Sequence, residues 1–185
     1  MTPKAPLKFT LAAALLALVA PTLTTPAQAH PPRTTSANLL DRIQIEDFLV
    51  DYYQPLGGGK QEDLASFFTE DGVIDVNGRV YNGHAGITQA YKDAGSANNG
   101  NAAFKGKFLM LMNNPRIEIH GDTATADVVW TGIVSTTPKD QPHLAEQGKE
   151  HDDLVKVKGE WMIKKRIITS TGGLAPFFQA TYKDR

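Results

Sequence analysis

The hydrophobic pattern of this chain changes its period part-way along, and that change constrains the fold more than any other feature. From Asn38, apolar residues recur every three or four positions, which predicts one amphipathic helix. From Val73 onward the period falls to two, which is typical of strands. Helices followed by a meander of long strands predict an α+β fold, in which a curved antiparallel sheet wraps over the N-terminal helices and leaves a cone-shaped cavity. The predicted apolar stripe of the first helix consists of Leu39, Leu40, Ile43, Phe48, Leu49, Tyr52, Tyr53 and Leu56.

Three glycines and a lysine, Gly57 to Lys60, follow the first helix. A phosphate-binding loop needs a preceding strand and the spacing Gly-x-x-x-x-Gly-Lys-Ser/Thr. Here a helix precedes the glycines and Gln61 follows the lysine, so the pattern does not fit a nucleotide site. We interpret the glycines as the end of the helix, since glycine accepts the left-handed conformation found there, and Lys60 as a solvated side chain.

Turn motifs divide the rest of the chain. Asn77-Gly78 predicts a tight hairpin between strands at 73–76 and 79–81. Lys158-Gly159 predicts a second hairpin, between strands at 151–158 and 160–170. The other predicted elements are a short helix at 61–68, a helix at 85–93, a loop at 95–106, a strand at 107–119 that Asn113-Asn114-Pro115 interrupts, and a strand at 123–134.

The N-terminus has the pattern of a secretory signal. Lys4 and Lys8 precede an unbroken apolar run, residues 11–20, and Ala27-Gln28-Ala29 fits a small-residue cleavage site. The apolar run is shorter than the roughly 20 residues that cross a bilayer. We therefore expect an exported protein, periplasmic or secreted, with no membrane association after cleavage. The expected parts are a signal peptide at 1–29, a flexible lead-in at 30–37 and one folded domain at 38–185.

Composition excludes several functions. The chain has no cysteine, so disulfides, thiol catalysis and thiolate metal sites are excluded. Without residues 1–29 it has 17 Lys and Arg against 20 Asp and Glu, a net charge of −3, and no basic stripe that would indicate a nucleic-acid partner. No metal-binding signature such as His-Glu-x-x-His is present, so we expect no metal site. Proton transfer needs only side chains, and we expect no cofactor.

Several short motifs, taken in order, resemble the SnoaL-like family of the nuclear transport factor 2-like superfamily, whose relatives include scytalone dehydratase, polyketide cyclases and ketosteroid isomerase. The resemblance covers about residues 38 to 170. It implies a cone-shaped α+β barrel, a homo-oligomer, and a pocket inside the cone for a small hydrophobic substrate or ligand. The motifs are Phe68-x-x-Asp71-Gly72, Asn114-Pro115-x-Ile117, Gly121-Asp122-x-Ala124, and Asp152-x-x-Val155-Lys156 ahead of Gly159-x-Trp161.

The resemblance also singles out Tyr52, because lyases of the family carry a pocket-facing tyrosine at this place. Such a phenol can donate a proton or a hydrogen bond to a substrate oxygen. The alternative is a core aromatic residue with a satisfied hydroxyl. Two positions depart from the family pattern, since Gly57 replaces an aspartate and Met110 replaces a histidine. The family's His–Asp dyad is therefore absent.

Four ionisable residues, Glu150 to Asp153, begin the predicted strand before the second hairpin. Alternation places Glu150 and Asp152 on one face and His151 and Asp153 on the other. Two neighbouring carboxylates can raise the pKa of one of them and create a general base. On the other face, His151 could act as the base with Asp153 as its orienting partner. The alternative is an exposed strand end with solvated charges.

Apolar strand residues are candidates for the pocket wall: Phe108, Met110, Met112 and Trp130. We expect that alternation prevents all of them from facing inward, and Trp130 is either a stacking surface or plain core. We interpret Lys164, Lys165 and Arg166 as a basic, solvent-facing strand end.

The leading hypothesis is an exported enzyme that acts on a small, largely apolar, cyclic molecule by elimination or isomerisation, as a lyase or an isomerase. In this hypothesis Tyr52 polarises a substrate oxygen, and Glu150, Asp152 or His151 takes the proton. The alternative is a non-catalytic binding or oligomerisation module of the same fold.

Overall fold

The structure is a computed structural model that describes residues 33–57, 61–97, 107–135, 137, 139–173 and 176–182. The predicted signal peptide lies outside these residues, as does Lys60. The described residues belong to one compact unit, Pro32–Arg185. Its elements in chain order are α1 (Leu39–Tyr53), the 3-10 helices η1 (Gln54–Gly57) and η2 (Gln61–Phe67), β1 (Phe68–Val76), β2 (Arg79–Asn82), α2 (Gly83–Ala97), β3 (Lys107–His120), β4 (Thr123–Ser135), β5 (His143–Val157), β6 (Glu160–Gly172) and α3 (Pro176–Gln179).

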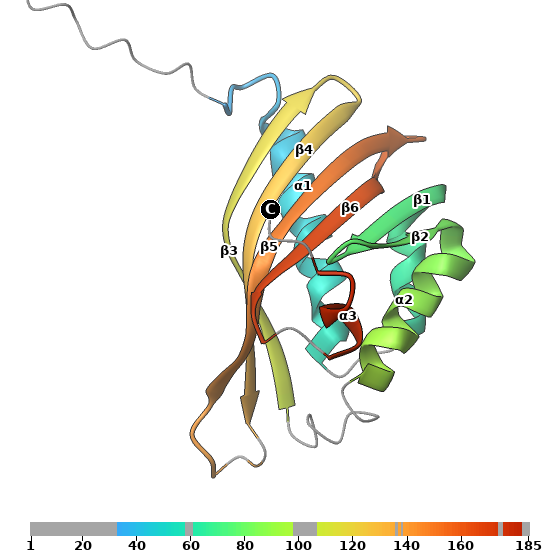
Figure 1. Cartoon of the computed structure of the whole chain (residues 1–185). Helices are drawn as coiled ribbons and strands as arrows, with labels where there is room; N and C mark the ends of the chain where they lie inside the picture. Colours follow the sequence, from blue (N-terminus) through green and yellow to red (C-terminus); the bar gives the residue numbers. More distant parts are fainter. Residues whose placement is uncertain are drawn as a thin grey trace, which may run out of the picture. The chain divides into compact units, whose positions relative to one another are not determined.

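The six strands form one open sheet in the order β2-β1-β6-β5-β4-β3. The sheet is curved, and α1 lies on its concave side (Figure 1). This arrangement confirms the predicted α+β class, with a curved sheet wrapped over N-terminal helices. One detail differs from the prediction: β1 and β6 are parallel, whereas every other neighbouring pair is antiparallel. Among the described residues, no helix is long and apolar enough to span a bilayer.

Both predicted hairpins are present and have the same turn geometry. Asn77 and Gly78 have φ angles of 53° and 90°, and Lys158 and Gly159 have φ angles of 53° and 91°. Two successive positive φ angles are the mark of a type I′ turn, which matches the twist of the flanking strands. The sequence rule therefore placed both turns correctly.

Strand β5 begins at His143, well before the predicted start at His151. This first part contains Gly148 and mostly polar residues, which have low intrinsic strand preference. It forms a strand because it pairs with β4, in a register that begins at His143 opposite Val134. Residues 150–153 consequently lie in the interior of a long strand. The exposed strand end that was the alternative for these residues is wrong for Glu150 and Asp152, which are buried.

Strand β6 contains a β-bulge that changes which side chains point inward. Ile163 pairs with Leu154 of β5, whereas Arg166 pairs with Asp152, so β6 uses one residue more than its partner over this stretch. The extra residue shifts the alternation, and the inward face passes from Ile163 to Arg166. Arg166 is 0% exposed, so its interpretation as solvent-facing was wrong. Lys164 and Lys165 are exposed, as predicted.

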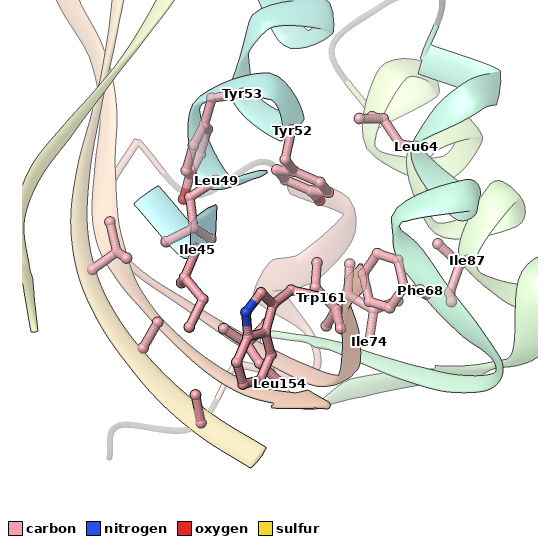
Figure 2. Close-up of a cluster of buried hydrophobic side chains, with 14 of the residues drawn as sticks. Ile45, Leu49, Tyr52, Tyr53, Leu64, Phe68, Ile74, Ile87, Leu154 and Trp161 are labelled. Atoms are coloured by element: carbon pink, nitrogen blue, oxygen red, sulfur yellow. The ribbon is translucent and has the colours of Figure 1, made fainter. Parts of the chain in front are cut away.

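The core lies between α1, the concave face of the sheet and the elements around α2. Figure 2 shows Ile45, Leu49 and Tyr53 of α1 pointing toward the sheet, while Tyr52 points toward Phe68. These residues follow the spacing i, i+4, i+7 and i+8 of one helix face. The predicted stripe was wrong in its first part, because Leu39, Leu40 and Ile43 are exposed by 48%, 67% and 46%.

Candidate active site

Five buried polar side chains of α1, β5 and β6 lie together near the end of α1. Glu150 and Asp152 come from β5, because alternation places both on its inward face. The bulge in β6 brings Arg166 to the same face, opposite Asp152. Tyr52 and Tyr53 at the end of α1 cover this group from above, and each of the five residues is at most 6% exposed.

Arg166 is held by contacts on several sides. Its Nε and Nη2 atoms donate hydrogen bonds to the two oxygens of Asp152, at 2.7 and 2.8 Å, which is the strong bidentate geometry of an Arg–carboxylate pair. The ring of Tyr52 lies against the guanidinium, with the ring centroid 3.7 Å from Cζ. Its Nη1 atom is buried and has no hydrogen-bond partner among the described residues. Arg166 is therefore oriented with one N–H group still free to donate.

Glu150 lies beside this pair and is buried with a raised pKa. Its Oε1 atom is 3.1 Å from Nη2 of Arg166, but the geometry is not that of a hydrogen bond and Oε1 has no such partner among the described residues. Burial raises the pKa of Glu150 to about 8, with a further rise from Asp152, and Arg166 only partly opposes this. A carboxyl group with a pKa near neutrality can both accept and return a proton.

Tyr53 is a site residue that the sequence analysis did not single out. Its hydroxyl is buried and forms no hydrogen bond of good geometry with the described residues, but it lies close enough to Glu150 to lower the pKa of that carboxyl group. Burial raises the pKa of Tyr53, and the charge of Glu150 raises it further, so the phenol stays neutral and able to donate. Burial likewise raises the pKa of Tyr52. The only sequence signal was that both tyrosines lie on the predicted apolar stripe, which could not show which hydroxyl lacks a partner.

A comparison with protein families matches residues 37–167 to the SnoaL-like domain. The chain belongs to this family. An uncharacterized protein of Mycobacterium tuberculosis (strain ATCC 25618 / H37Rv) is 28% identical over 133 residues, which are 72% of this chain and 87% of that protein. The resemblance predicted from the short motifs is thus confirmed.

Solved structures show the same fold as this SnoaL-like domain. The putative scytalone dehydratase from Novosphingobium aromaticivorans superposes with a TM-score of 0.61 at 23% identity, over 82% of this chain and 94% of that one. ActVI-ORFA from Streptomyces coelicolor also gives a TM-score of 0.61, at 22% identity, over 70% of this chain and 97% of that one. At this level of identity the likeness concerns the fold.

The remaining candidate, His151, lies on the opposite face of the sheet from Glu150 and Asp152. Its Nδ1 atom is 2.7 Å from Oδ1 of Asp127, and its Nε2 atom is 3.6 Å from Asp153. The side chain is 43% exposed. The hydrogen bond with Asp127 raises the pKa of His151, although burial opposes the rise. Among the described residues, no group of three or more His, Asp and Glu side chains is placed to hold a metal ion.

The predicted wall residues share one face of the SnoaL-like sheet. Met112 pairs directly with Trp130, and Met110 lies two residues from Met112 on the same strand. Trp130 is 4% exposed within the core, and both methionines pack against the core. These three residues therefore share the inward face, and the expectation that all four could not do so depends on Phe108. Phe108 pairs with Val134 through its backbone, and its side chain lies outside the described part of the chain.

Trp130 also depends on a glycine of β5. A Cβ atom at Gly148 would lie 2.3 Å from Cζ2 of Trp130 and 2.6 Å from the carbonyl oxygen of Thr169. Both distances are too short for any side chain. Gly148 lies on the inward face, two residues before Glu150, and it leaves the space that the indole ring occupies.

Proposed function

We propose that this SnoaL-like protein is an exported enzyme that binds a small, largely apolar, cyclic molecule and catalyses elimination or isomerisation by general acid/base chemistry. The observation that carries the proposal is the position of Glu150. This buried carboxyl group, with a pKa near neutrality, lies beside Arg166 and Tyr53, which each keep an unpaired donor among the described residues. The dehydratase name of one structural neighbour agrees with this reaction class.

In the proposed mechanism Glu150, as carboxylate, takes a proton from a carbon atom next to a substrate carbonyl group. Nη1 of Arg166 and the hydroxyl of Tyr53 donate hydrogen bonds to the carbonyl oxygen, where negative charge develops. Glu150, now a carboxylic acid, returns the proton. Return to another carbon completes an isomerisation, and return to a leaving hydroxyl group releases water and completes an elimination. No redox step or group transfer is needed.

Asp152 and Tyr52 have a positioning role in this mechanism. Both oxygens of Asp152 already accept hydrogen bonds from Arg166, so this carboxylate is less suited than Glu150 to take the proton. The ring of Tyr52 covers one face of the guanidinium. Together they fix the direction of Nη1, since the planar guanidinium is held along one edge by Asp152 and against one face by Tyr52. Trp130, Met110 and Met112 provide apolar surface on the same inward face.

The test is proton exchange on a panel of cyclic ketones and cyclic β-hydroxyketones in deuterated water, followed by NMR. The wild-type protein should exchange the proton next to the carbonyl group, or release water, and E150Q should lose this activity. Y53F should lower kcat by about a hundredfold, the usual cost of one oxyanion donor. E118Q is the matched control, because Glu118 pairs with Arg116 at the surface, and it should behave as wild type. Full activity in E150Q would contradict the proposal.

The alternative function is a binding or oligomerisation module, and the outward face of the sheet favours a homo-oligomer. Leu109, Leu111, Val129 and Leu144 on neighbouring strands β3, β4 and β5 are exposed by 57%, 44%, 44% and 65%. Exposed apolar groups that cluster on a sheet face are typical of subunit contacts. Sedimentation analysis of wild type and L144E would test the oligomer. Ligand binding without exchange or water release in the assay above would support the module.

Export is part of the proposal and rests on the N-terminal sequence pattern. Secretory signals are removed after a small-residue motif, here Ala27-Gln28-Ala29. The protein recovered from the periplasm or the medium should therefore begin at His30, and mass spectrometry of the intact chain would show this. A full-length chain that stays in the cytoplasm would contradict it.

A further inference from the structure

A groove of about 410 Å³ lies on the surface between α1, the end of η2 and the hairpin that joins β5 to β6. Six of its lining residues are aromatic or acidic. Three are aromatic, namely Phe48, Phe67 and Trp161, and three are acidic, namely Asp47, Asp51 and Glu160. None of these six residues belongs to the buried site around Glu150.

The aromatic side chains give the groove an apolar wall. The rings of Phe48 and Phe67 are in contact, with centroids 5.4 Å apart and planes inclined by 60°. Trp161 is 5% exposed and closes the groove on the side of the hairpin. Aromatic faces of this kind bind apolar groups, and their negative π-faces also attract cations.

The carboxylates of the groove have no cationic partner within the part of the chain that the structure describes. Asp47, Asp51 and Glu160 are exposed, and none of them forms a hydrogen bond or an ion pair with the residues that the structure describes. The groove therefore carries three negative charges next to aromatic rings. A ligand with a positive charge and an apolar body would complement both features.

The same helix already shows this chemistry more than one turn toward the N-terminus, at Asp41. Asp41 pairs with the ammonium group of Lys156, and that ammonium group also lies 4.9 Å from the ring centroid of Trp161. One cation is thus held between a carboxylate of α1 and the indole ring. Asp47 and Asp51 lie farther along the helix, on the face that looks toward the groove, and the described chain supplies no second cation there.

We propose that this groove is a binding site for a small organic cation, an amine or a guanidine with an aromatic or branched apolar body. The charged group lies among Asp47, Asp51 and Glu160, and the apolar body lies against Phe48 and Phe67. The proposal is independent of the acid/base site, because it uses no residue of that site.

The test compares two probes of the same shape, 2-phenylethylamine, which is a cation at pH 7, and the neutral 2-phenylethanol. Each is titrated into ¹⁵N-labelled protein and followed by NMR. The amine should shift the signals of Gly159, Glu160 and Met162 and bind at least fivefold more tightly than the alcohol. Its affinity should fall as salt rises, because exposed charges are screened.

Variants separate the groove from general charge effects. D47N/D51N should weaken binding of the amine by about tenfold, as expected for the loss of two exposed ion pairs. The matched control E70Q/D122N also removes two negative charges, but neither residue lines the groove, and it should bind as wild type. E150Q should also bind as wild type.

Four outcomes would overturn the proposal: no detectable binding of the amine, equal binding of the two probes, unchanged affinity in D47N/D51N, or signal shifts centred on residues 148–152. The last outcome would place the probe at the buried site. If E150Q loses the exchange activity but still binds the amine as wild type does, the groove and the buried acid/base site are two separate sites.

Discussion

The two faces of β5 carry similar charged groups at similar distances, and the protein places them in opposite environments. On the inward face, Oδ1 of Asp152 lies 2.7 Å from Nε of Arg166, and both side chains are 0% exposed. On the outward face, Oδ1 of Asp127 on β4 lies 2.7 Å from Nδ1 of His151, and these side chains are 55% and 43% exposed. Distance alone therefore does not distinguish the two pairs.

The difference shows that burial decides what an ion pair contributes. Water screens the outward pair, so its contribution to stability is about 0 to 1 kcal/mol. On the inward face no water competes, so removing one partner leaves an uncompensated charge in an apolar place. The inward group can thus hold the carboxyl group of Glu150 at an unusual pKa, whereas the side chains of the outward pair remain about half exposed to solvent. Three predictions test this contrast, in order of expected size.

The largest effect should come from removing the buried cation. R166M leaves Glu150 and Asp152 without their partner, and the free energy of unfolding should fall by about 3–5 kcal/mol. K165M removes the neighbouring exposed lysine and should change it by no more than about 0.5 kcal/mol. Urea denaturation followed by circular dichroism measures both. If R166M fails to fold, E150L/D152L/R166M should fold again, because an apolar replacement of the whole group leaves no buried charge. Equal losses in R166M and K165M would contradict the contrast.

The second effect concerns pH. The pKa of Glu150 is about 8 in the folded protein and near 4.5 when the side chain is solvated, so the folded state binds this proton more tightly. Glu150 therefore destabilises the fold progressively as pH rises from about 4.5 to 8 and adds no further change above 8. Since one pKa unit corresponds to about 1.4 kcal/mol, the total is on the order of a few kcal/mol.

Unfolding measured between pH 5 and pH 9 in wild type and E150Q isolates this contribution. Wild type should lose stability over the interval relative to E150Q, because glutamine cannot ionise. If the free energy of unfolding of the two proteins varied with pH in parallel, Glu150 would titrate as a solvated carboxyl group. Burial on the inward face would then not have raised its pKa, which would contradict the contrast between the two faces.

The smallest effect belongs to the outward face. D127N removes the hydrogen bond that raises the pKa of His151, so that pKa should fall toward its ordinary value. Stability below the ordinary pKa should fall by at most about 1 kcal/mol, and the difference should vanish as pH rises through the folded pKa. NMR titration of the His151 ring measures the pKa. D153N is the matched control and should shift it less, since Asp153 lies 3.6 Å from Nε2. A larger shift in D153N would contradict the assignment.

Local rules recovered the parts of the fold that depend on local chemistry. Asn77-Gly78 and Lys158-Gly159 each adopt positive φ angles at both positions. Each pair has a glycine at the second position, where a positive φ costs least, so these turns could be placed from sequence. The alternation that puts Glu150 and Asp152 on one face also held, because it needs only the knowledge that the segment is a strand.

The parts that depend on distant partners could not be predicted in this way. The start of β5 at His143 is set by pairing with β4, and nothing in the local sequence favours a strand there. Arg166 follows two exposed lysines, so its burial depends on an extra residue in β6 whose presence is visible only from the pairing with β5 and β1. The surroundings of the Tyr53 hydroxyl are set by three elements, α1, β5 and β6, which are far apart in the sequence.

The bulge in β6 also affects how relatives of this protein should be aligned. Opposite this stretch β1 is irregular too, since Phe68 pairs with Ile163 and Val73 pairs with Lys165. A homologue that lacks the additional position would place its own inward-pointing cation one column away from Arg166 in a gapless alignment. Such an alignment would suggest, wrongly, that the homologue lacks the buried cation. Conservation at this position should be scored after the two strands are superposed, because column identity alone would compare a core guanidinium with a surface amine.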